Sequence, residues 1–430
     1  MNVSDSERIS TTLARDGFEM TENDSDADVV IINTCSVREK AEHKLYSRVG
    51  RLRKKAKNKM PVVGVMGCVA QLEGETLFNK IEGVNFVLGT RAVGRVSNAI
   101  NETVRTGKNV VDVGEREDNY DWTVADTHRH SPYVAFLPII EGCNKFCTYC
   151  IVPFSRGRER SFEASEIVRQ VEELKKKGVR EVHLIGQNVN SYRPATDSGL
   201  EGFAGKSAFS KLLRAVAATG IERIKFTTSF PRDFRSDIVD AIEENENLCN
   251  WVHLPVQSGS NRVLKLMKRG HTIENYFQKI DRLRSSGRDI AITTDVIVGF
   301  PGETEEDFQD SVKMVEYCGF DMAYIFKYSP RPGTPAFDMP DDVSAADKTI
   351  RFMELESAQK RIQNNRLQRY INKVLKVLVE SRSSRNNHGF TGHSSCHKVV
   401  NFEGSSDMLG KIVDVKITDI KANSLFGEVL

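Results

Sequence analysis

The sequence predicts an α/β protein in three parts: an N-terminal parallel α/β domain, a central partial (β/α) barrel and a small C-terminal β-barrel. The chain has 430 residues, which is more than one compact core usually contains. Helix-like and strand-like segments alternate over most of it, as in parallel sheets. After about residue 365 only strand-like segments with glycines between them follow, which is typical of a small barrel. The expected domains are 1–115, 129–365 and 366–430.

Two short apolar runs predict the sheet of the first domain. Residues Asp28–Asn33 and Val62–Met66 are rich in valine and isoleucine, as buried parallel strands are. Segments with helical periodicity flank both runs. The polar stretch 115–132 follows and is expected to be a linker.

The central part alternates in the same way over a longer stretch. Because parallel barrels carry their catalytic groups at the carboxyl ends of the strands, those ends are where we look for the site. A long charged helix is expected over 345–371, followed by strands over 374–379 and 411–417. The candidate strands of the central part are Val182–Ile185, Ile224–Thr228, Val252–Leu254, Ile290–Val298 and Tyr324–Phe326.

Composition excludes a membrane protein and argues against a secreted one. Hydrophobic residues make up 39% of the chain, but no run approaches the roughly 20 apolar residues needed to cross a bilayer. The N-terminus carries no apolar secretory segment, so a cytoplasmic location is expected. In a reducing compartment the eight cysteines are metal ligands, nucleophiles or core residues rather than disulfides.

The strongest chemical signal is the triplet Cys143, Cys147 and Cys150, spaced C-x3-C-x2-C. Three thiolates from one loop can hold a 4Fe-4S cluster and leave one iron open for another ligand. The alternative is a zinc site, which needs a fourth ligand. The candidates for that ligand are His128, His130 and His183.

The triplet, together with Arg156-Gly157, resembles the radical S-adenosylmethionine methylthiotransferases. The resemblance extends over the whole chain and includes the segments Asn33–Glu42, Gly67–Gln71 and Val399–Gly404. It implies a methylthiotransferase domain, a radical barrel and an RNA-binding TRAM barrel, in that order. It also implies that S-adenosylmethionine binds the open iron and is cleaved there to a 5′-deoxyadenosyl radical.

Cys35 and Cys68 each follow a predicted strand, which brings two thiols to one edge of the first sheet. Residue type alone leaves open that they are buried core cysteines. The resemblance implies a second, auxiliary 4Fe-4S cluster held by three cysteines. This part of the chain supplies two, and because Met1-Asn2 resembles the end of the segment that carries the first, the third ligand is expected upstream of Met1.

Two strands of the central part end in residues suited to hold S-adenosylmethionine. Leu184–Asn190 ends in glycine and amides, and Thr294–Thr304 ends in a glycine-rich turn. That turn could instead cap a helix through Thr304, and Arg156 could form an ordinary salt bridge. The predicted cofactor-binding residues are Gln187, Asn188, Asp295, Gly299 and Arg156.

The resemblance implies that the substrate is a tRNA carrying N(6)-dimethylallyladenosine at position 37, and that a methylthio group is added to carbon 2 of this base. An electron donor and a sulfur donor are further expected partners. From residue 366 onward ten Lys and Arg stand against six Asp and Glu, which favours an RNA-binding barrel. Lys373, Lys376, Arg382, Arg385 and Lys398 lie in its first half.

Phe230 departs from the histidine that this subgroup usually carries. This departure leaves two related substrates open: threonylcarbamoyladenosine in tRNA and an aspartate of a ribosomal protein. A zinc-dependent RNA-binding protein without catalytic activity is the alternative from another class.

Overall fold

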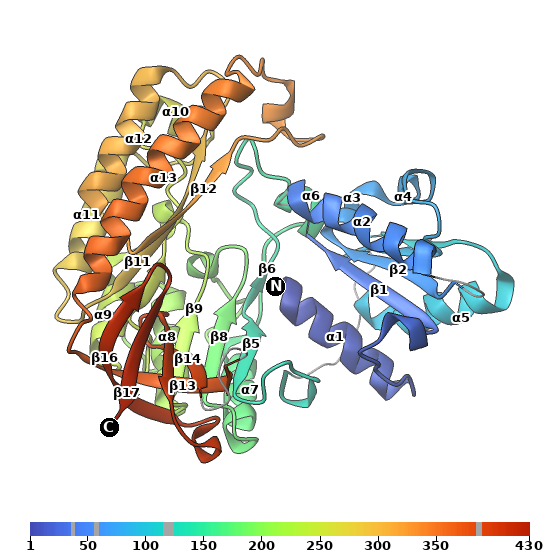
Figure 1. Ribbon diagram of the computed structural model, residues 1–430, viewed down its shortest axis with the longest axis horizontal. Coiled ribbons are helices and arrows are strands. Elements are labelled where there is room, and N and C mark those ends of the chain that lie inside the picture. The colour runs from blue at the N-terminus through green and yellow to red at the C-terminus, as the bar shows by residue number, and fades with distance from the viewer. Residues whose placement is uncertain (36–38, 56–59, 115–123, 384–388) are drawn as a thin grey trace. The chain divides into compact units, whose positions relative to one another are not determined.

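The computed structural model describes residues 1–35, 39–55, 60–114, 124–383 and 389–430. Figure 1 shows the chain coloured from its N-terminus to its C-terminus. The chain forms two compact units. The first contains residues 1–130, 141–146 and 150–159, and the second contains residues 131–140, 147–149 and 160–430. The first half of the stretch expected to be a linker, residues 115–123, lies outside the described residues.

The first unit is built on a four-stranded parallel sheet with its strands in chain order. Two core clusters pack against the sheet. One joins the strands to α1 and α5, and the other joins them to α2. The predicted parallel α/β domain is therefore confirmed. The strands are β1 (Val29–Thr34), β2 (Val62–Gly67), β3 (Phe86–Leu88) and β4 (Val110–Asp112), and the helices are α1 (Asn2–Arg15), α2 (Glu39–Lys55), α3 (Cys68–Glu73), α4 (Thr76–Lys80) and α5 (Val96–Thr106).

The second unit contains two three-stranded parallel sheets, ordered β5-β8-β9 and β10-β11-β12. A single bridge between Ile224 and Leu248 links the edge of the first sheet to the segment before β10, so the described barrel is partial. All five predicted strands are present, and one further strand of these sheets, Val134–Pro138, was not predicted. The strands are β5 (Val134–Pro138), β8 (Glu181–Ile185), β9 (Arg223–Phe226), β10 (Trp251–His253), β11 (Ala291–Val298) and β12 (Met322–Lys327).

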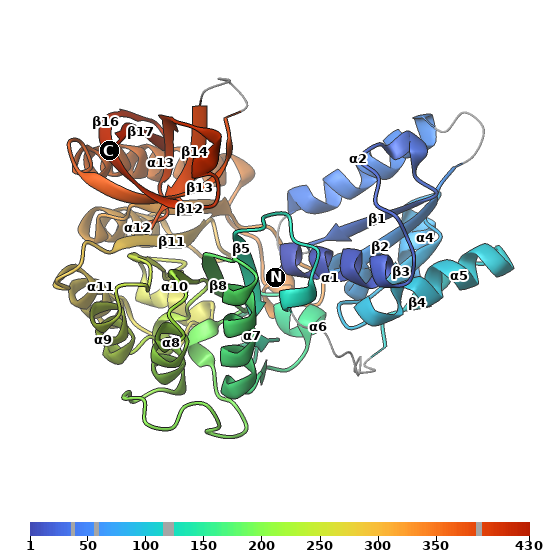
Figure 2. The same cartoon turned by 90° about the horizontal axis from the view of Figure 1, so that it is seen from below.

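Helices cover these sheets, and three of them, over residues 164–176, 208–218 and 236–244, are seen along the lower edge of the unit in Figure 2. Most of them return the chain to the start of the next parallel strand, which keeps the sheets parallel. The helix Asn261–Leu266 leads instead into another helix, and the helix Ala345–Gln368 leads into the C-terminal strands. The helices are α7 (Ala164–Lys176), α8 (Ala208–Ala218), α9 (Ser236–Glu244), α10 (Asn261–Leu266), α11 (Ile273–Arg284), α12 (Glu305–Cys318) and the predicted long helix α13 (Ala345–Gln368).

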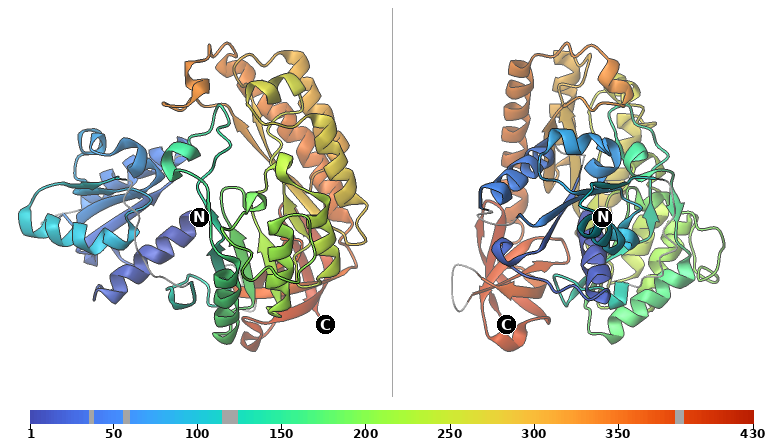
Figure 3. Two further views of the ribbon diagram at one scale, coloured as in Figure 1. Left: turned by 180° about the vertical axis from the view of Figure 1, so that it is seen from behind. Right: turned by 90° about the vertical axis from the view of Figure 1, so that its right-hand side faces the viewer.

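The C-terminal part is a closed barrel with strand order β13-β14-β15-β17-β16, which confirms the predicted small β-barrel. Figure 3 shows it in red beside the green and yellow strands of the same unit. Trp251 and Ala291, at the starts of β10 and β11, belong to the hydrophobic core of this barrel. Its strands are β13 (Val374–Arg382), β14 (Gly389–Ser394), β15 (Val399–Glu403), β16 (Ile412–Lys421) and β17 (Ser424–Val429).

None of the helices in the described ranges combines the length and the apolarity that crossing a bilayer requires.

Candidate functional site

The cysteine triplet lies in the loop between β6 (Ile140–Glu141) and α6 (Val152–Arg156). Cys143 and Cys150 group with the first unit and Cys147 with the second. Cys143 and Cys147 are buried, Cys150 is half-buried, and all three are free thiols. Gly142 makes the turn into this loop with a φ of +76°, which favours glycine. A Cβ atom on residue 142 would also overlap the backbone of Arg158.

Cys147 and its neighbours are fixed to the end of α10. The Thr148 amide donates to the Met267 carbonyl at 3.2 Å, and the Thr148 hydroxyl donates to the Leu266 carbonyl at 3.0 Å. The Thr148 carbonyl accepts from the Ala336 amide at 2.8 Å. These bonds hold the middle thiol of the triplet in place before any ligand arrives.

Arg269 donates from Nη1 to the Cys147 Sγ at 3.4 Å, a contact that sequence reasoning did not find. Its Nη2 donates to the Pro255 carbonyl at 2.7 Å, and its guanidinium lies 4.4 Å from the centre of the Phe230 ring. Stacking on an aromatic face stabilises a buried guanidinium. The phenylalanine noted above as a departure from the subgroup thus supports the arginine that contacts a cysteine of the triplet.

The segment that carries Phe230 is held in an unusual backbone conformation. Asn190 accepts from the Phe230 amide at 2.7 Å and donates to its carbonyl at 2.8 Å. Thr228, just after β9, has a φ of +69°, and Gln257, just after β10, has a φ of +84°. Such strain in non-glycine residues concentrates at functional sites, because the surrounding contacts must hold it.

The predicted cofactor residues Gln187 and Asn188 lie just beyond the carboxyl end of β8, whereas Asp295 lies within β11, three residues before its carboxyl end. Among the described residues, none forms a hydrogen bond with the buried Oε1 atom of Gln187, so this acceptor is available to a polar ligand. Asp295 is half-buried, 3.5 Å from His253 Nε2, and His253 Nδ1 contacts the Thr293 hydroxyl at 2.9 Å. His253 therefore has partners on both ring nitrogens.

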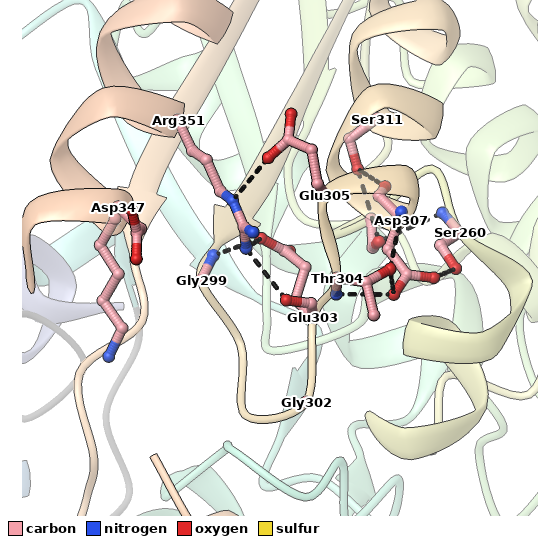
Figure 4. A network of polar contacts seen from close by, with 12 residues as sticks. Ser260, Gly299, Gly302, Glu303, Thr304, Glu305, Asp307, Ser311, Asp347 and Arg351 are labelled. Carbon is pink, nitrogen blue, oxygen red and sulfur yellow. Dashed lines mark hydrogen bonds and ion pairs between the residues drawn. The ribbon is translucent and has the colours of Figure 1, made fainter. Parts of the chain in front are cut away.

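Gly299 forms the turn after β11, and Figure 4 shows the contacts that brace it. Its amide donates to Glu303 at 2.7 Å, and Glu303 pairs with Arg351 at 2.9 Å. Burial raises the pKa of Glu303, although these contacts oppose the shift. Thr304 caps α12 in a reciprocal capping box with Asp307, so the helix-capping alternative is confirmed for this turn.

Arg156, the fifth predicted cofactor residue, pairs with Asp5 of α1 within the first unit. The two side chains are 9% and 7% exposed and share two hydrogen bonds. Burial alone would raise the pKa of Asp5, but Arg156 holds it below its usual value. The structure therefore gives Arg156 a buried carboxylate as its partner.

Cys35 and Cys68 follow paired residues of neighbouring strands. Thr34 of β1 lies opposite Gly67 of β2, so both thiols come from the same edge of the sheet, as predicted. Cys68 is buried and Cys35 is half-buried. The Met1 amino group lies near both, and burial lowers its pKa while Asp5 and the two cysteines oppose that shift.

The remaining cysteines are packing residues. Cys249 and Cys318 are 5% and 2% exposed, as expected for core positions. Burial raises the pKa of the Cys249 thiol to about 12 and that of the Cys318 thiol further still. Cys396 lies inside the C-terminal barrel beside the Ser394 hydroxyl, 3.1 Å away.

Part of the predicted basic surface of the C-terminal barrel serves other contacts. Lys398 lies 3.8 Å from Asp321, and Lys373 lies 3.9 Å from Asp289. These two lysines therefore neutralise carboxylates of the same unit. Arg385 lies outside the described residues.

No three His, Cys, Asp or Glu side chains of the described ranges lie close enough together to hold a metal ion. Whether the triplet suits an iron–sulfur cluster is therefore judged from the type of its ligand atoms. Three free cysteines in one loop, with an arginine on one sulfur, match the ligands of such a cluster. His183, a candidate zinc ligand, instead bonds Glu181 in β8 and packs 5.0 Å from Phe136.

Three family models match the chain in succession. The model described as uncharacterized protein family UPF0004 matches residues 1–89, the radical SAM superfamily matches residues 137–315, and the TRAM domain matches residues 368–430. A tRNA-2-methylthio-N(6)-dimethylallyladenosine synthase of Haemophilus influenzae strain PittEE is 44% identical over 437 aligned positions, which cover all of this chain and 90% of the relative. The chain belongs to the radical SAM methylthiotransferase family.

Another relative supports this assignment, and a solved structure shares the fold. The synthase of the same description from Actinobacillus succinogenes is 44% identical and also covers the whole chain. A solved radical S-adenosylmethionine methyltransferase from Kitasatospora setae, with tryptophan and a cofactor analogue bound, matches with a TM-score of 0.57. It covers 78% of this chain and 72% of its own at 14% identity, so this likeness concerns the fold alone. As radical SAM family membership implies, the methylthiotransferase uses a 4Fe-4S cluster and S-adenosylmethionine, which argues against the zinc alternative.

Proposed function

We propose that this methylthiotransferase adds a methylthio group to carbon 2 of N(6)-dimethylallyladenosine at position 37 of tRNA. The observation that carries the proposal is 44% identity, over the whole chain, to relatives named for that reaction. The TRAM match and the closed C-terminal barrel suit an RNA substrate. A source of electrons and a source of sulfur are the further partners that the reaction needs.

Cys143, Cys147 and Cys150 are the proposed ligands of the cluster that binds S-adenosylmethionine. When bound, the cluster and S-adenosylmethionine together supply a carbon radical strong enough to remove hydrogen from an unactivated aromatic carbon. The protein's own part is to hold the sulfurs and to set the electron affinity of the centre. Arg269 is placed for the second task by its bond to Cys147, 3.4 Å long.

Gln187, Asn188 and Asp295 are the proposed contacts for S-adenosylmethionine. The unpaired Oε1 of Gln187 is ready to accept a hydrogen bond, and the Asp295 carboxylate can accept from a hydroxyl or an ammonium. Gly299 shapes the turn beside them rather than donating its own amide, because that amide already donates to Glu303. Arg156 is not proposed as a contact for S-adenosylmethionine. It pairs with Asp5 and lies near Cys68, so we assign it to the surroundings of Cys68.

Cys35 and Cys68 are proposed as ligands of the auxiliary 4Fe-4S cluster. They come from one sheet edge, and the Arg156 guanidinium near Cys68 offsets the negative charge that a thiolate brings there. Conversion of either to serine should remove the auxiliary iron while leaving the other cluster in place.

The test of the proposed function is nucleoside analysis of tRNA. A bacterial strain that lacks its own methylthiotransferase of this kind should regain 2-methylthio-N(6)-dimethylallyladenosine when it expresses this chain. The same strain carrying Cys147→Ala should not regain it. If methylthio-threonylcarbamoyladenosine appears instead, or only a ribosomal protein is modified, the proposed substrate is wrong while the family assignment stands.

A further inference from the structure

The second unit contains an open cavity of about 440 Å³ whose polar lining is dominated by cations. It lies between the η5 turn with the start of α9 on one side and α11 on the other. No acidic side chain lines it, and the hydrocarbon walls are Phe234 and Val239. The cations are Lys206 before α8, Arg232 in η5 (Pro231–Asp233), Arg235 before α9, and Lys279 and Arg282 on α11.

Most of these charges have no carboxylate partner. Arg282 is neutralised by Asp240 at 2.8 Å and Glu243 at 2.5 Å, and Arg232 pairs with Asp233 at 3.1 Å. Within the described part of the chain, no carboxylate pairs with the side chain of Lys206, Arg235 or Lys279. Burial lowers the pKa of Lys279, and no negative group opposes the shift. An anion in this cavity would supply the missing charge.

The backbone that carries Lys206 and Arg235 is fixed by hydrogen bonds to Asp237. The carboxylate of Asp237, in the first turn of α9, accepts from the amides of Lys206 and Ser207 at 2.8 Å each. It also accepts from the Ser210 hydroxyl at 2.6 Å. The loop that carries Lys206 is thereby tied to the helix that follows Arg235. Two unpaired cations from different segments are thus fixed near each other.

The cavity is also connected to the cysteine triplet through a short stack of side chains. The Arg232 guanidinium lies 5.4 Å from the Phe230 ring, and Arg269 lies 4.4 Å from the same ring. Arg269 in turn contacts Cys147 Sγ at 3.4 Å. The cavity therefore lies beyond the carboxyl end of β9, on the end of the strands where the candidate cofactor residues are found.

We propose that this cavity binds a backbone phosphodiester of the RNA substrate and so positions the strand beside the reacting base. The inference rests on the proposed function, since it needs an RNA substrate. Arginine and lysine bind phosphate oxygens through charge-assisted hydrogen bonds, and phosphate contacts fix the register of a nucleic acid. The site is separate from the C-terminal barrel, so the RNA is gripped at two places on this unit.

The experiment compares tRNA binding by the cluster-loaded full-length protein with binding by the double variant Lys206→Gln/Arg235→Gln. Dissociation constants are measured from about 50 to 300 mM salt. We expect roughly tenfold weaker binding and a salt slope smaller by about 1 to 2, since each lost phosphate contact releases fewer counterions. The matched control is Lys175→Gln/Lys176→Gln at the far end of α7, which should change neither value. Thermal midpoints and iron content verify that both variants are intact.

Three results would overturn the proposal. The first is an affinity and slope equal to those of the unsubstituted protein, and the second is an equal loss in the control. The third is loss of inorganic phosphate or nucleoside monophosphate binding with unchanged tRNA affinity, which would identify a small anion as the ligand. Failure of the proposed function is recognised separately, because nucleoside analysis of the complemented strain would then show no 2-methylthio-N(6)-dimethylallyladenosine, whatever the tRNA affinity of the variants.

Discussion

At the scale of single residues, Arg269 is the feature with the clearest chemical consequence. It is 5% exposed, stacks on Phe230 and donates a hydrogen bond to the sulfur of Cys147. Hydrogen bonds to ligand sulfurs raise the reduction potential of iron–sulfur clusters, because they stabilise the added electron. A cluster that must be reduced before it can cleave its cofactor is sensitive to that bond.

We therefore predict that Arg269→Gln lowers the midpoint potential of the cluster that we propose for the triplet. A bond of about 1 kcal/mol corresponds to roughly 40 mV for one electron. Potentiometric titration followed by electron paramagnetic resonance measures this shift. Arg284→Gln, which removes a partly buried arginine paired with Asp321 instead, serves as the control and should leave the potential unchanged. An unchanged potential in Arg269→Gln would show that the contact is only structural.

Sequence alone led to the three cysteines, because their spacing is local. It did not lead to Arg269, which is 122 positions from Cys147 and reaches it only through the fold. Phe230 was recognised as unusual from the sequence, but its role as a surface for Arg269 required the structure. A residue that contacts the site from a distant part of the chain has no fixed spacing from the other site residues, so the sequence does not reveal it.

At the scale of elements, the turn after β11 is the part of the site that depends most on backbone conformation. Gly299 has a φ of +70°, and a Cβ there would overlap the Lys348 side chain. Its amide donates to the Glu303 carboxylate, which also pairs with Arg351, so the turn is fixed by these two contacts. The glycine is required both by conformation and by space.

Gly299→Ala should therefore weaken S-adenosylmethionine binding several-fold and lower the free energy of unfolding by about 2 kcal/mol or more. Gly319→Ala is the matched control, because Gly319 has a φ of +56° but open space around it. The control should lose only about 1 kcal/mol of stability and keep its affinity. Calorimetry gives both quantities, and equal cofactor affinity in the two variants would contradict this account of the turn.

The longer elements were predictable because their patterns are strong. The apolar run before Asn33 and the amphipathic helices are confirmed within a few residues. Strands β3 and β4 have three residues each, too few for a periodic signal, and they were not predicted individually. Strand β5 was not predicted either, although it is mostly buried and forms an edge of the first sheet of the second unit.

At the scale of the whole molecule, the joint between the parallel strands and the C-terminal barrel contains a buried polar cluster beside its hydrophobic contacts. Arg223 pairs with Glu181 at 3.2 Å and donates to the His393 carbonyl at 2.8 Å and the Lys376 carbonyl at 3.1 Å. Burial alone would raise the pKa of Glu181, but His183 and Arg223 hold it at about 2. One carboxylate thus supports the arginine that docks the barrel.

Glu181→Gln should destabilise the second unit by about 2 to 3 kcal/mol at pH 7, because it leaves Arg223 buried without its counter-charge. An unfolded glutamate titrates near 4.3, so the unfolded chain takes up this proton first and the pair's contribution falls as pH drops from about 4.5 to about 2. The variant should therefore show a flatter acid dependence in denaturant titrations. Glu222→Gln, at the exposed pair with Arg180, should change stability by less than about 0.5 kcal/mol. A variant as acid-sensitive as the original would refute this role of Glu181.

The central claim is that Cys143, Cys147 and Cys150 alone hold the cluster that cleaves S-adenosylmethionine. The most direct measurement is Mössbauer and electron paramagnetic resonance spectroscopy of the Cys35→Ala/Cys68→Ala variant, prepared without oxygen. We predict one 4Fe-4S cluster per chain, a resonance that changes when S-adenosylmethionine is added, and 5′-deoxyadenosine after reduction. Protein that contains zinc or no metal, or a resonance indifferent to S-adenosylmethionine, would contradict the account.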